Sequence, residues 1–200
     1  MFEKQIVIDA KGHIMGRLAA VIAKQLLSGQ RVIVVRVEKL VLSGSLFRRK
    51  TEYMEFLNKT SSKNPKRGGP YHFKAPSKLF WRAIRGMVPH KTARGKAALE
   101  RLKIFEGCPY PYSHAKKTYV PVALKSVRLG SNRKSCLLKD LSHHIGWNKA
   151  ALVEKLETKR EKLAHEYHVK KTKLSNAIEA EVAKIKEVAD IKNQLAALGY

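Results

Sequence analysis

The sequence predicts an α/β domain built on a small, mostly parallel sheet and followed by a long helical extension. Three observations support this prediction. Two apolar, β-branched runs enclose an amphipathic helical pattern near the N-terminus, more helical patterns follow, and after Trp147 apolar residues recur near helical spacing among balanced charges. A strand, a helix and a second strand form a βαβ unit, from which parallel sheets are built. With 200 residues, the chain is long enough for one domain with its own core and an appendage.

The first unit runs from a strand at residues 5–9 through a helix at residues 14–27 to a second strand at residues 31–37. The second strand is a nearly continuous β-branched run, which is typical of a strand buried on both faces of a parallel sheet. The helix has small and large apolar residues on one face, so this face can lie close to the sheet. These residues are Leu18, Ala19, Ile22, Ala23 and Leu26.

Three more helices are expected, over residues 46–59, 77–87 and 92–105. Ser77 is the expected N-cap of the second, and Pro89 separates it from the third. The first and third helices each have a short apolar face. In the first these residues are Phe47, Tyr53, Met54 and Leu57, and in the third they are Ala97, Ala98, Leu102 and Phe105.

The rest of the chain has weaker patterns. Residues 108–112 are rich in proline and aromatic side chains and are expected to be extended, and residues 118–129 have room for a short strand. Beyond Trp147 the apolar stripe is thin, which predicts long helices laid on a partner surface or a coiled-coil arm.

Positive charge is concentrated in the middle of the chain. Residues 43–135 contain 22 Lys and Arg against 4 Asp and Glu, whereas residues 1–42 have 7 against 3 and residues 136–200 have 12 against 9. Such a surplus repels itself in a compact fold unless a polyanion neutralises it, and a nucleic acid does so with release of counterions. A membrane partner is not expected, because neither an amphipathic helix with a clean apolar face nor a membrane-spanning apolar run is present. We expect a soluble protein of a reducing compartment, since Cys108 and Cys136 form no paired motif.

The same region offers little for catalysis. Gly12 and Gly16 lie between a strand and a helix, as phosphate-binding glycines do, but a Gly-x-Gly-x-x-Gly motif is absent. A turn glycine and a glycine for close helix packing explain them better, although the helix N-terminus there could hold an RNA phosphate. The histidines lack zinc-site spacing, and Cys108 has no base in register. We therefore expect no catalytic residues, no metal and no cofactor.

Two basic segments favour RNA as the polyanion. Residues 60–76 are rich in Lys, Ser, Asn, Gly and Pro without apolar periodicity, which predicts a loop that orders on a partner. Residues 85–96 form a bend between two helices and present Arg and Lys in several directions. Such a corner suits an irregular folded RNA better than the straight groove of DNA, and no single recognition helix stands out.

The chain also resembles a known family, the universal large-subunit ribosomal protein L-thirteen (L13) family in its eukaryotic form. The resemblance covers most of residues 4–135 in order, and the end of the tail, LAALGY, is similar to the eukaryotic extension. The segments that resemble the family are VIDAKGH at 7–13, GRLA at 16–19, GMVPHKT at 86–92, RG at 94–95, and RLK at 101–103 with Gly107.

This resemblance implies a three-layer α/β/α domain at residues 1–135, with an extended basic loop at residues 60–76, and a helical extension at residues 136–200. It implies a non-catalytic constituent of the large (60S) subunit, which binds ribosomal RNA and supports subunit assembly and translation. The implied partners are large-subunit ribosomal RNA and neighbouring large-subunit proteins, with no small-molecule substrate. The implied location is the cytoplasmic ribosome, after nuclear and nucleolar passage. The tail, residues 148–198, is expected to lie on the ribosome exterior, against expansion RNA or other proteins.

The cations of the charged region are the expected RNA contacts. They are Arg17, Arg48, Arg49, Lys50, Lys63, Lys66, Arg67, Lys74, Lys78, Arg82, Arg85, His90, Lys91, Arg94, Lys96, Lys116 and Lys117. Four aromatic side chains among them can stack on bases, of which Phe73 and Trp81 can equally anchor the loop to the core. These are Tyr71, His72, Phe73 and Trp81. Two alternatives stay open, a free regulatory RNA-binding protein and a nucleotide-dependent enzyme on a Rossmann-like sheet.

Overall fold

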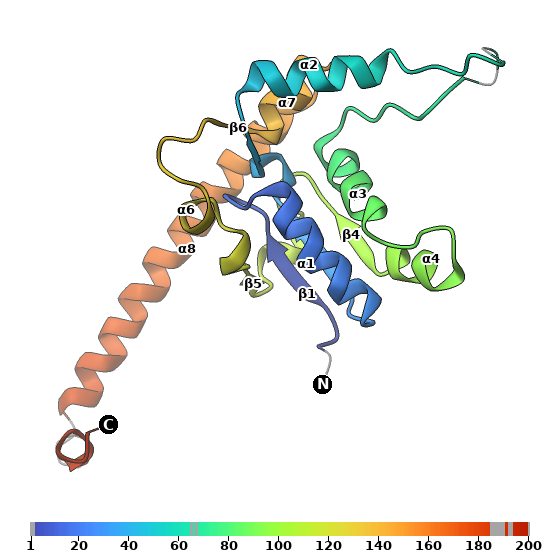
Figure 1. Ribbon diagram of the computed structural model, residues 1–200. Coiled ribbons are helices and arrows are strands. Elements are labelled where there is room, and N and C mark those ends of the chain that lie inside the picture. Colours follow the sequence, from blue (N-terminus) through green and yellow to red (C-terminus); the bar gives the residue numbers. More distant parts are fainter. Residues whose placement is uncertain (1–2, 65, 67, 185–190, 192–193, 200) are drawn as a thin grey trace. The chain divides into compact units, whose positions relative to one another are not determined.

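The computed structural model describes residues 3–64, 66, 68–184, 191 and 194–199 of the chain (Figure 1). Two compact units are present, Met1–Glu154 and Lys155–Tyr200. The first contains all the strands of the described residues, and the second contains most of a long helix.

A four-stranded parallel sheet forms the centre of the first unit. Its strands are β1 (Ile6–Asp9), β2 (Val32–Val35), β4 (Leu102–Ile104) and β5 (Lys117–Thr118), in the order β4-β2-β1-β5. In this register Val7 lies opposite Ile33, and Val34 lies opposite Ile104. All four residues of β2 are buried, as its β-branched run predicts.

The core on one face of the sheet includes residues of α1 (Met15–Leu27), α3 (Pro76–Gly86) and α4 (Ala93–Glu100). The apolar face expected for α1 is confirmed, because its five residues are buried against Ile8 and Val34 of the sheet. Phe80 and Ile84 of α3 belong to the same core and are fully buried. Each such side chain contributes about 1.5 to 3 kcal/mol when removed from water.

The other face of the sheet has a smaller cluster. Val7, Ile33 and Val35 are buried there and pack against residues of the segment 105–115, which contains the short helix α5 (Tyr110–Ser113). The covering side chains are Phe105, Cys108, Tyr112 and Ala115. The expected α/β class with a small parallel sheet is therefore confirmed, and this face is covered mostly by irregular chain.

A second, antiparallel pair of strands was not expected from the sequence. In it β3 (Val41–Ser43) pairs with β6 (Ser135–Leu137). Helix α2 (Leu46–Leu57) follows β3, and α7 (Leu138–His144) follows β6. This pairing brings residues from the start of the tail into the first unit. The strongly basic region ends at residue 135, whereas the first compact unit continues to Glu154.

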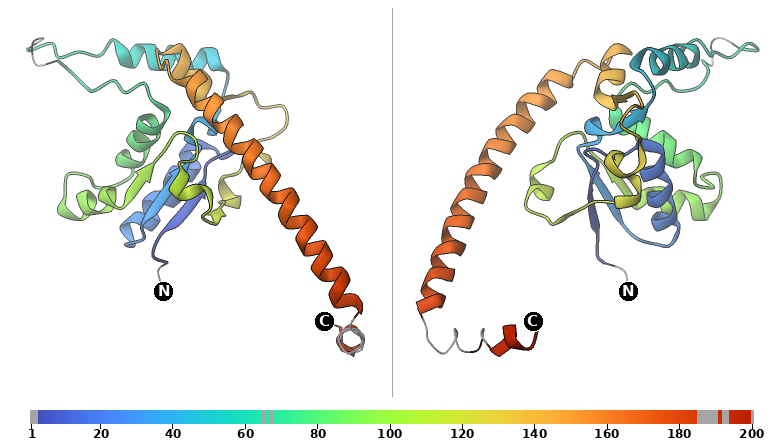
Figure 2. Two further views of the ribbon diagram at one scale, coloured as in Figure 1. Left: turned by 180° about the vertical axis from the view of Figure 1, so that it is seen from behind. Right: turned by 60° about the vertical axis from the view of Figure 1, so that its left-hand side comes forward.

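The remaining elements are short, apart from the tail helix. They are the 3-10 helices η1 (Val37–Lys39) and η3 (Pro121–Ala123) and the helix α6 (Lys125–Arg128). The tail contains α8 (Ala150–Lys184), and Figure 2 shows it as one continuous helix, which confirms the expected long helix. Within the described residues, no helix combines the length and apolarity that a membrane crossing needs.

Three expected boundaries are wrong. The helix expected over 92–105 ends at Glu100, because Leu102–Ile104 pair with the edge of β2 instead. Part of the segment expected to be extended at 108–112 lies in α5, with Pro109 and Pro111 at its start. The strand expected within 118–129 stops at Thr118, and η3 and α6 follow it.

Two side-chain roles also differ from expectation. Ser77 is not the N-cap of α3, because Ala75 holds that position and Pro76 begins the helix. The Ser77 hydroxyl and backbone N–H donate instead to Glu106, at 2.5 and 3.1 Å. In α2 the expected apolar face is not buried, since Phe47 is 80% exposed.

Candidate nucleic-acid interface

The outer face of α3 presents three cations at helical spacing. Phe80 and Ile84 turn one face of this helix into the core, so Lys78, Arg82 and Arg85 remain exposed on the other. Helix α3 contains no acidic residue to neutralise them. Its exposed face is therefore a short row of positive charge.

Aromatic rings hold these cations in place. The Lys78 Nζ lies 5.9 Å from the ring centre of Phe73 and 5.7 Å from that of Trp81. The Arg85 guanidinium lies 5.8 Å from the ring centre of Trp81. Cation–π contacts of this kind contribute about 0.5 to 1 kcal/mol at exposed sites and restrict the cation's position while leaving its N–H groups available.

Arg82 connects α3 to the base of the basic loop. Its guanidinium lies 3.7 Å from the ring centre of Phe56 in α2, and the His72 ring packs edge-on against Phe56 at 4.5 Å. The Tyr53 hydroxyl donates to the backbone carbonyl of Phe73. The end of the loop is thus attached to both α2 and α3.

These contacts decide which aromatic side chains are free to stack on a base. His72, Phe73 and Trp81 are partly buried against protein, whereas Tyr71 is 82% exposed. Tyr71 and Phe73 stack with their ring centres 6.3 Å apart and their planes inclined by 19°. Tyr71 is therefore the aromatic residue best placed to receive a nucleobase.

The corner between α3 and α4 is tightly built. The Thr92 hydroxyl accepts from the backbone N–H of Gly95 at 3.2 Å and donates to the carbonyl of Pro89 at 2.7 Å. A Cβ atom on Gly95 would lie 1.9 Å from the Pro89 carbonyl oxygen, so only glycine fits there. Three exposed cations stand on this corner, with the half-buried His90 beside them. They are Lys91, Arg94 and Lys96.

The cations of α2 are partly engaged within the chain. Arg48 and Arg49 both contact Glu52, at 3.0 and 2.7 Å, and their hydrogen bonds lower the pKa of this carboxyl group. The Arg49 Nε also donates to the Ser43 carbonyl at 2.8 Å. Arg48, whose side chain is 73% exposed, is the freer of the two, and Lys50 is half-buried.

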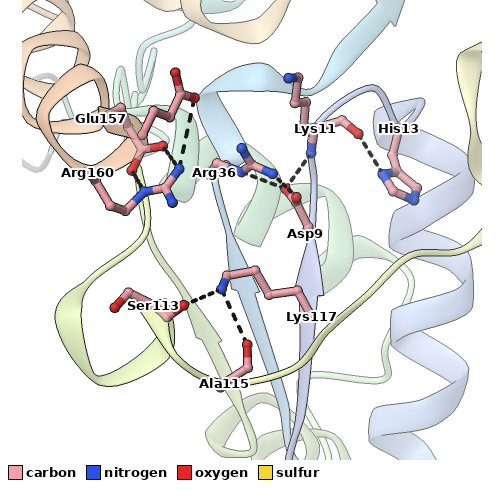
Figure 3. A network of polar contacts seen from close by, with 10 residues as sticks. Asp9, Lys11, His13, Arg36, Ser113, Ala115, Lys117, Glu157 and Arg160 are labelled. Atoms are coloured by element: carbon pink, nitrogen blue, oxygen red, sulfur yellow. Dashed lines mark hydrogen bonds and ion pairs between the residues drawn. The ribbon is translucent and has the colours of Figure 1, made fainter. Parts of the chain in front are cut away.

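The last expected contacts lie in different settings. The Lys117 Nζ donates to the backbone carbonyls of Ser113 and Ala115, at 2.8 and 3.3 Å, and so closes the turn after α5 (Figure 3). The Lys117 ammonium group is therefore engaged by backbone carbonyls of its own chain, whereas the side chain of Lys116 is exposed to solvent. Arg17 is exposed on α1. The loop residues Lys63, Lys66 and Lys74 are exposed, and Arg67 lies outside the described residues.

Sequence reasoning left out one basic segment. Residues 125–134 hold four exposed cations and no acidic residue, over α6 and the turn before β6. They are Lys125, Arg128, Arg133 and Lys134. The local charge count is a signal that could have found them.

The turn after β1 uses its backbone N–H groups within the chain. Those of Gly12, His13 and Ile14 donate to the carbonyls of Lys39, Ala10 and Ala123, and that of Lys11 donates to the Asp9 carboxylate. Because these donors are occupied, they are not available to hold a phosphate. Gly12 has the positive φ of a turn glycine, 74°. Gly16 is exposed and has no atom within 4 Å of an added Cβ, so the expected close packing there is wrong.

Asp9 and Arg36 form an ion pair beside this turn, at the carboxyl ends of β1 and β2 (Figure 3). Burial alone would raise the pKa of Asp9, but hydrogen bonds from Arg36 and the Lys11 backbone N–H, with the nearby positive charges, bring it below its ordinary value. Arg36 is the one non-glycine residue with positive φ, 56°, in the described part of the chain. Its strained backbone is held by this pair and by a hydrogen bond to the Gly107 carbonyl at 2.8 Å.

His13 is buried at the same turn and joins two distant segments. Its Nδ1 lies 3.1 Å from the Lys11 carbonyl oxygen, and its Nε2 accepts from the Val120 backbone N–H at 2.9 Å. These two bonds assign the proton to Nδ1. In the described ranges, no group of three or more His, Cys, Asp and Glu side chains is placed to hold a metal ion.

Two comparisons with known proteins agree with each other. The family model described as "Ribosomal protein L13" matches residues 3–111, which is more than half of the chain. A protein of Tetrahymena thermophila, described as "Large ribosomal subunit protein uL13", is 56% identical over 200 residues, and the similarity covers the full length of both chains. The family match includes the βαβ unit, the basic loop, the α3–α4 corner and β4.

Proposed function

This chain belongs to the ribosomal protein L13 family and is a structural constituent of the large ribosomal subunit, and we propose that its outward-facing cations bind large-subunit ribosomal RNA. By this binding the protein stabilises the folded RNA and supports subunit assembly and translation. Its further partners are neighbouring large-subunit proteins. Its place is the cytoplasmic ribosome, which it reaches after assembly in the nucleus and nucleolus.

One observation supports this proposal most directly, namely the ordered row of Lys78, Arg82 and Arg85 on α3. A phosphate contact strengthens binding when it displaces counterions and costs little ordering of the side chain. The aromatic rings beneath these cations reduce that ordering cost in advance. The rigid corner at residues 86–95 then positions the cations of α4 relative to those of α3.

The basic loop and Tyr71 complete the proposed surface. The lysines of residues 60–76 add charge beyond the helices, and the exposed Tyr71 ring offers a face for a splayed base. Base stacking on an aromatic ring contributes about 1 to 3 kcal/mol and tolerates many sequences. The loop thus becomes ordered at the same time as it binds in an RNA crevice.

The same fold gives no support to the nucleotide-dependent enzyme. Nucleotide sites of doubly wound sheets lie at the carboxyl ends of the strands. There the backbone N–H groups of residues 11–14 are already bonded within the chain, and Asp9 pairs with Arg36 beside them. A cavity of about 640 Å³ lies beside the amino ends of the strands, lined by Gln5, Arg31 and Arg101 among others, and one of about 430 Å³ is lined by Met15, Leu42 and Tyr53 among others.

Sedimentation of native extract through sucrose gradients at low and high salt tests the proposal. We expect the chain to migrate with the large subunit and its RNA even in high salt. A free pool at the top of the gradient, or release by modest salt, would favour a transient RNA-binding protein instead.

A salt series tests the proposed contacts themselves. Removal of one phosphate-binding cation should reduce the slope of log affinity against log salt by about 0.7 to 0.9 and weaken binding mildly. We expect this for Arg85→Ala in filter binding to large-subunit RNA. Lys24→Ala, which removes an exposed lysine of α1 outside the expected contacts, should leave the slope unchanged. An Arg85→Ala protein with the unaltered slope would remove α3 from the interface.

A further inference from the structure

Helix α8 has a row of exposed apolar side chains with an 11-residue repeat. The spacings alternate between four and seven residues from Leu152 onward, and the exposed fraction of each side chain is between 53% and 67%. The residues are Leu152, Leu156, Leu163, Tyr167, Leu174 and Ile178. Monomeric proteins seldom leave so long a row of large apolar side chains open to water.

An 11-residue repeat keeps these residues on one face of the helix. It corresponds to about 3.67 residues per turn, close to the 3.6 of a straight α-helix, so the row drifts only slightly around the axis. Over the 26 residues from Leu152 to Ile178 it extends for about 39 Å, at about 1.5 Å per residue. A straight or slightly right-handed helix is the shape that can follow such a row over its full length.

A charged residue takes the third position of each repeat. Lys159, Lys170 and Glu181 follow three residues after Leu156, Tyr167 and Ile178, and all three are exposed on the same helix. Each of the first two repeats therefore has two apolar residues followed by a lysine, and the third has two apolar residues followed by a glutamate. Lysine stems can lie along apolar surface while their charges reach acidic groups at its edge.

We infer that this row of α8 docks against a single amphipathic helix of a neighbouring large-subunit protein, and that the partner presents acidic groups to Lys159 and Lys170. The two lysines set the register, because Glu181 already pairs with Lys184 of the same helix at 2.7 Å. RNA is disfavoured as the occupant, because phosphates would contact the lysines but would leave the Leu, Tyr and Ile side chains exposed. A second copy of this chain, paired in parallel, is disfavoured because it would place Lys159 and Lys170 opposite the same lysines of the other copy. This inference rests on membership of the large subunit and adds a partner class to it.

Photo-crosslinking in assembled large subunits tests the inference. Benzoylphenylalanine replaces Tyr167 in the full-length chain, subunits are isolated from gradients, and crosslinked peptides are identified by mass spectrometry. We expect crosslinks to a protein segment with a helical apolar repeat and acidic flanks. The same group at His165, on the opposite face of α8, should give at least fivefold less of this product. Crosslinks to ribosomal RNA, to a second copy of the chain, or to a protein segment without this pattern would overturn the inference, as would the absence of any crosslink.

Two charge reversals separate register from general electrostatics. Lys159→Glu with Lys170→Glu reverses charge within the row, and Lys162→Glu with Lys173→Glu makes the same change, also 11 residues apart, beside it. The first pair should lower the crosslink yield at least fivefold, while the second pair should leave it within twofold. Equal losses would overturn the inference. The same gradients measure incorporation of each chain into subunits. An unmodified chain that is not incorporated would contradict the proposed function as well as this inference.

Discussion

Gly95 fixes the geometry of the α3–α4 corner at the scale of a single residue. Its Cα faces the Pro89 carbonyl so closely that a methyl group would overlap it. We expect Gly95→Ala to lower the free energy of unfolding by about 3 kcal/mol or more, since backbone must shift to make room. Thermal and urea denaturation of the purified chain measure this loss.

The matched control for this substitution is on the helix before the corner. Gly86 ends α3 and has no atom within 4 Å of an added Cβ. Gly86→Ala should therefore be neutral or stabilise the chain by up to about 1 kcal/mol, through the lower entropy of the unfolded state. Equal destabilisation by both substitutions would show that the Pro89 contact does not limit the corner.

The Asp9–Arg36 pair makes stability depend on pH. Because the folded pKa of Asp9 lies below its ordinary value of 3.8, the pair stabilises the fold fully above that pH, and the contribution is lost as pH falls through the folded pKa. At pH 7 we expect Asp9→Asn to cost about 1.5 to 3 kcal/mol, as for a hydrogen bond to a charged group. Urea denaturation at pH 7, 5 and 3 measures the difference from the unaltered chain, which should narrow only at the lowest pH. A constant difference would contradict the role of the carboxylate charge.

At the scale of elements, Phe56 fastens the end of the basic loop. It contacts both the Arg82 guanidinium and the His72 ring, so it joins α2, α3 and the loop. We expect Phe56→Ala to raise the rate of tryptic cleavage in residues 58–75 several-fold, because local opening of the loop becomes easier. Phe47→Ala, at an exposed position of the same helix, should leave the rate unchanged. An unaltered rate for Phe56→Ala would mean that other contacts hold the loop.

Elements with strong local periodicity could be predicted from the sequence, and short elements with distant partners could not. The four-residue repeat of Leu18, Ile22 and Leu26 placed α1 correctly, because burial of one helix face decides it. By contrast, β4 has three residues and exists through its pairing with β2, about 70 residues away in the chain. The β3–β6 pair depends on contacts over a still longer stretch. Local spacing contains no signal for such pairings.

The candidate site shows the same division. The sequence identifies which side chains are cations and that they gather in one region. It does not reveal that Lys117 is used to close a turn, or that Arg49 binds the Ser43 carbonyl, because both acceptors are backbone atoms placed by the fold. It also does not reveal which aromatic rings are covered.

At the scale of the whole molecule, the net charge of +25 makes the free chain sensitive to salt. Without RNA, like charges on α2, α3 and the corner repel one another over distances comparable to the Debye length, which is about 30 Å at 0.01 M salt and about 8 Å at 0.15 M. Screening should therefore stabilise the isolated protein. We expect its melting temperature to rise by several degrees between 0.02 and 0.5 M sodium chloride, measured by circular dichroism. The rise should shrink in the chain that carries Lys78→Gln, Arg82→Gln and Arg85→Gln, because three of the repelling charges are gone. A melting temperature that falls with salt in the unaltered chain would mean that the ion pairs of Asp9, Glu52 and Glu154 outweigh the repulsion, and that the basic surface is tolerated without its RNA.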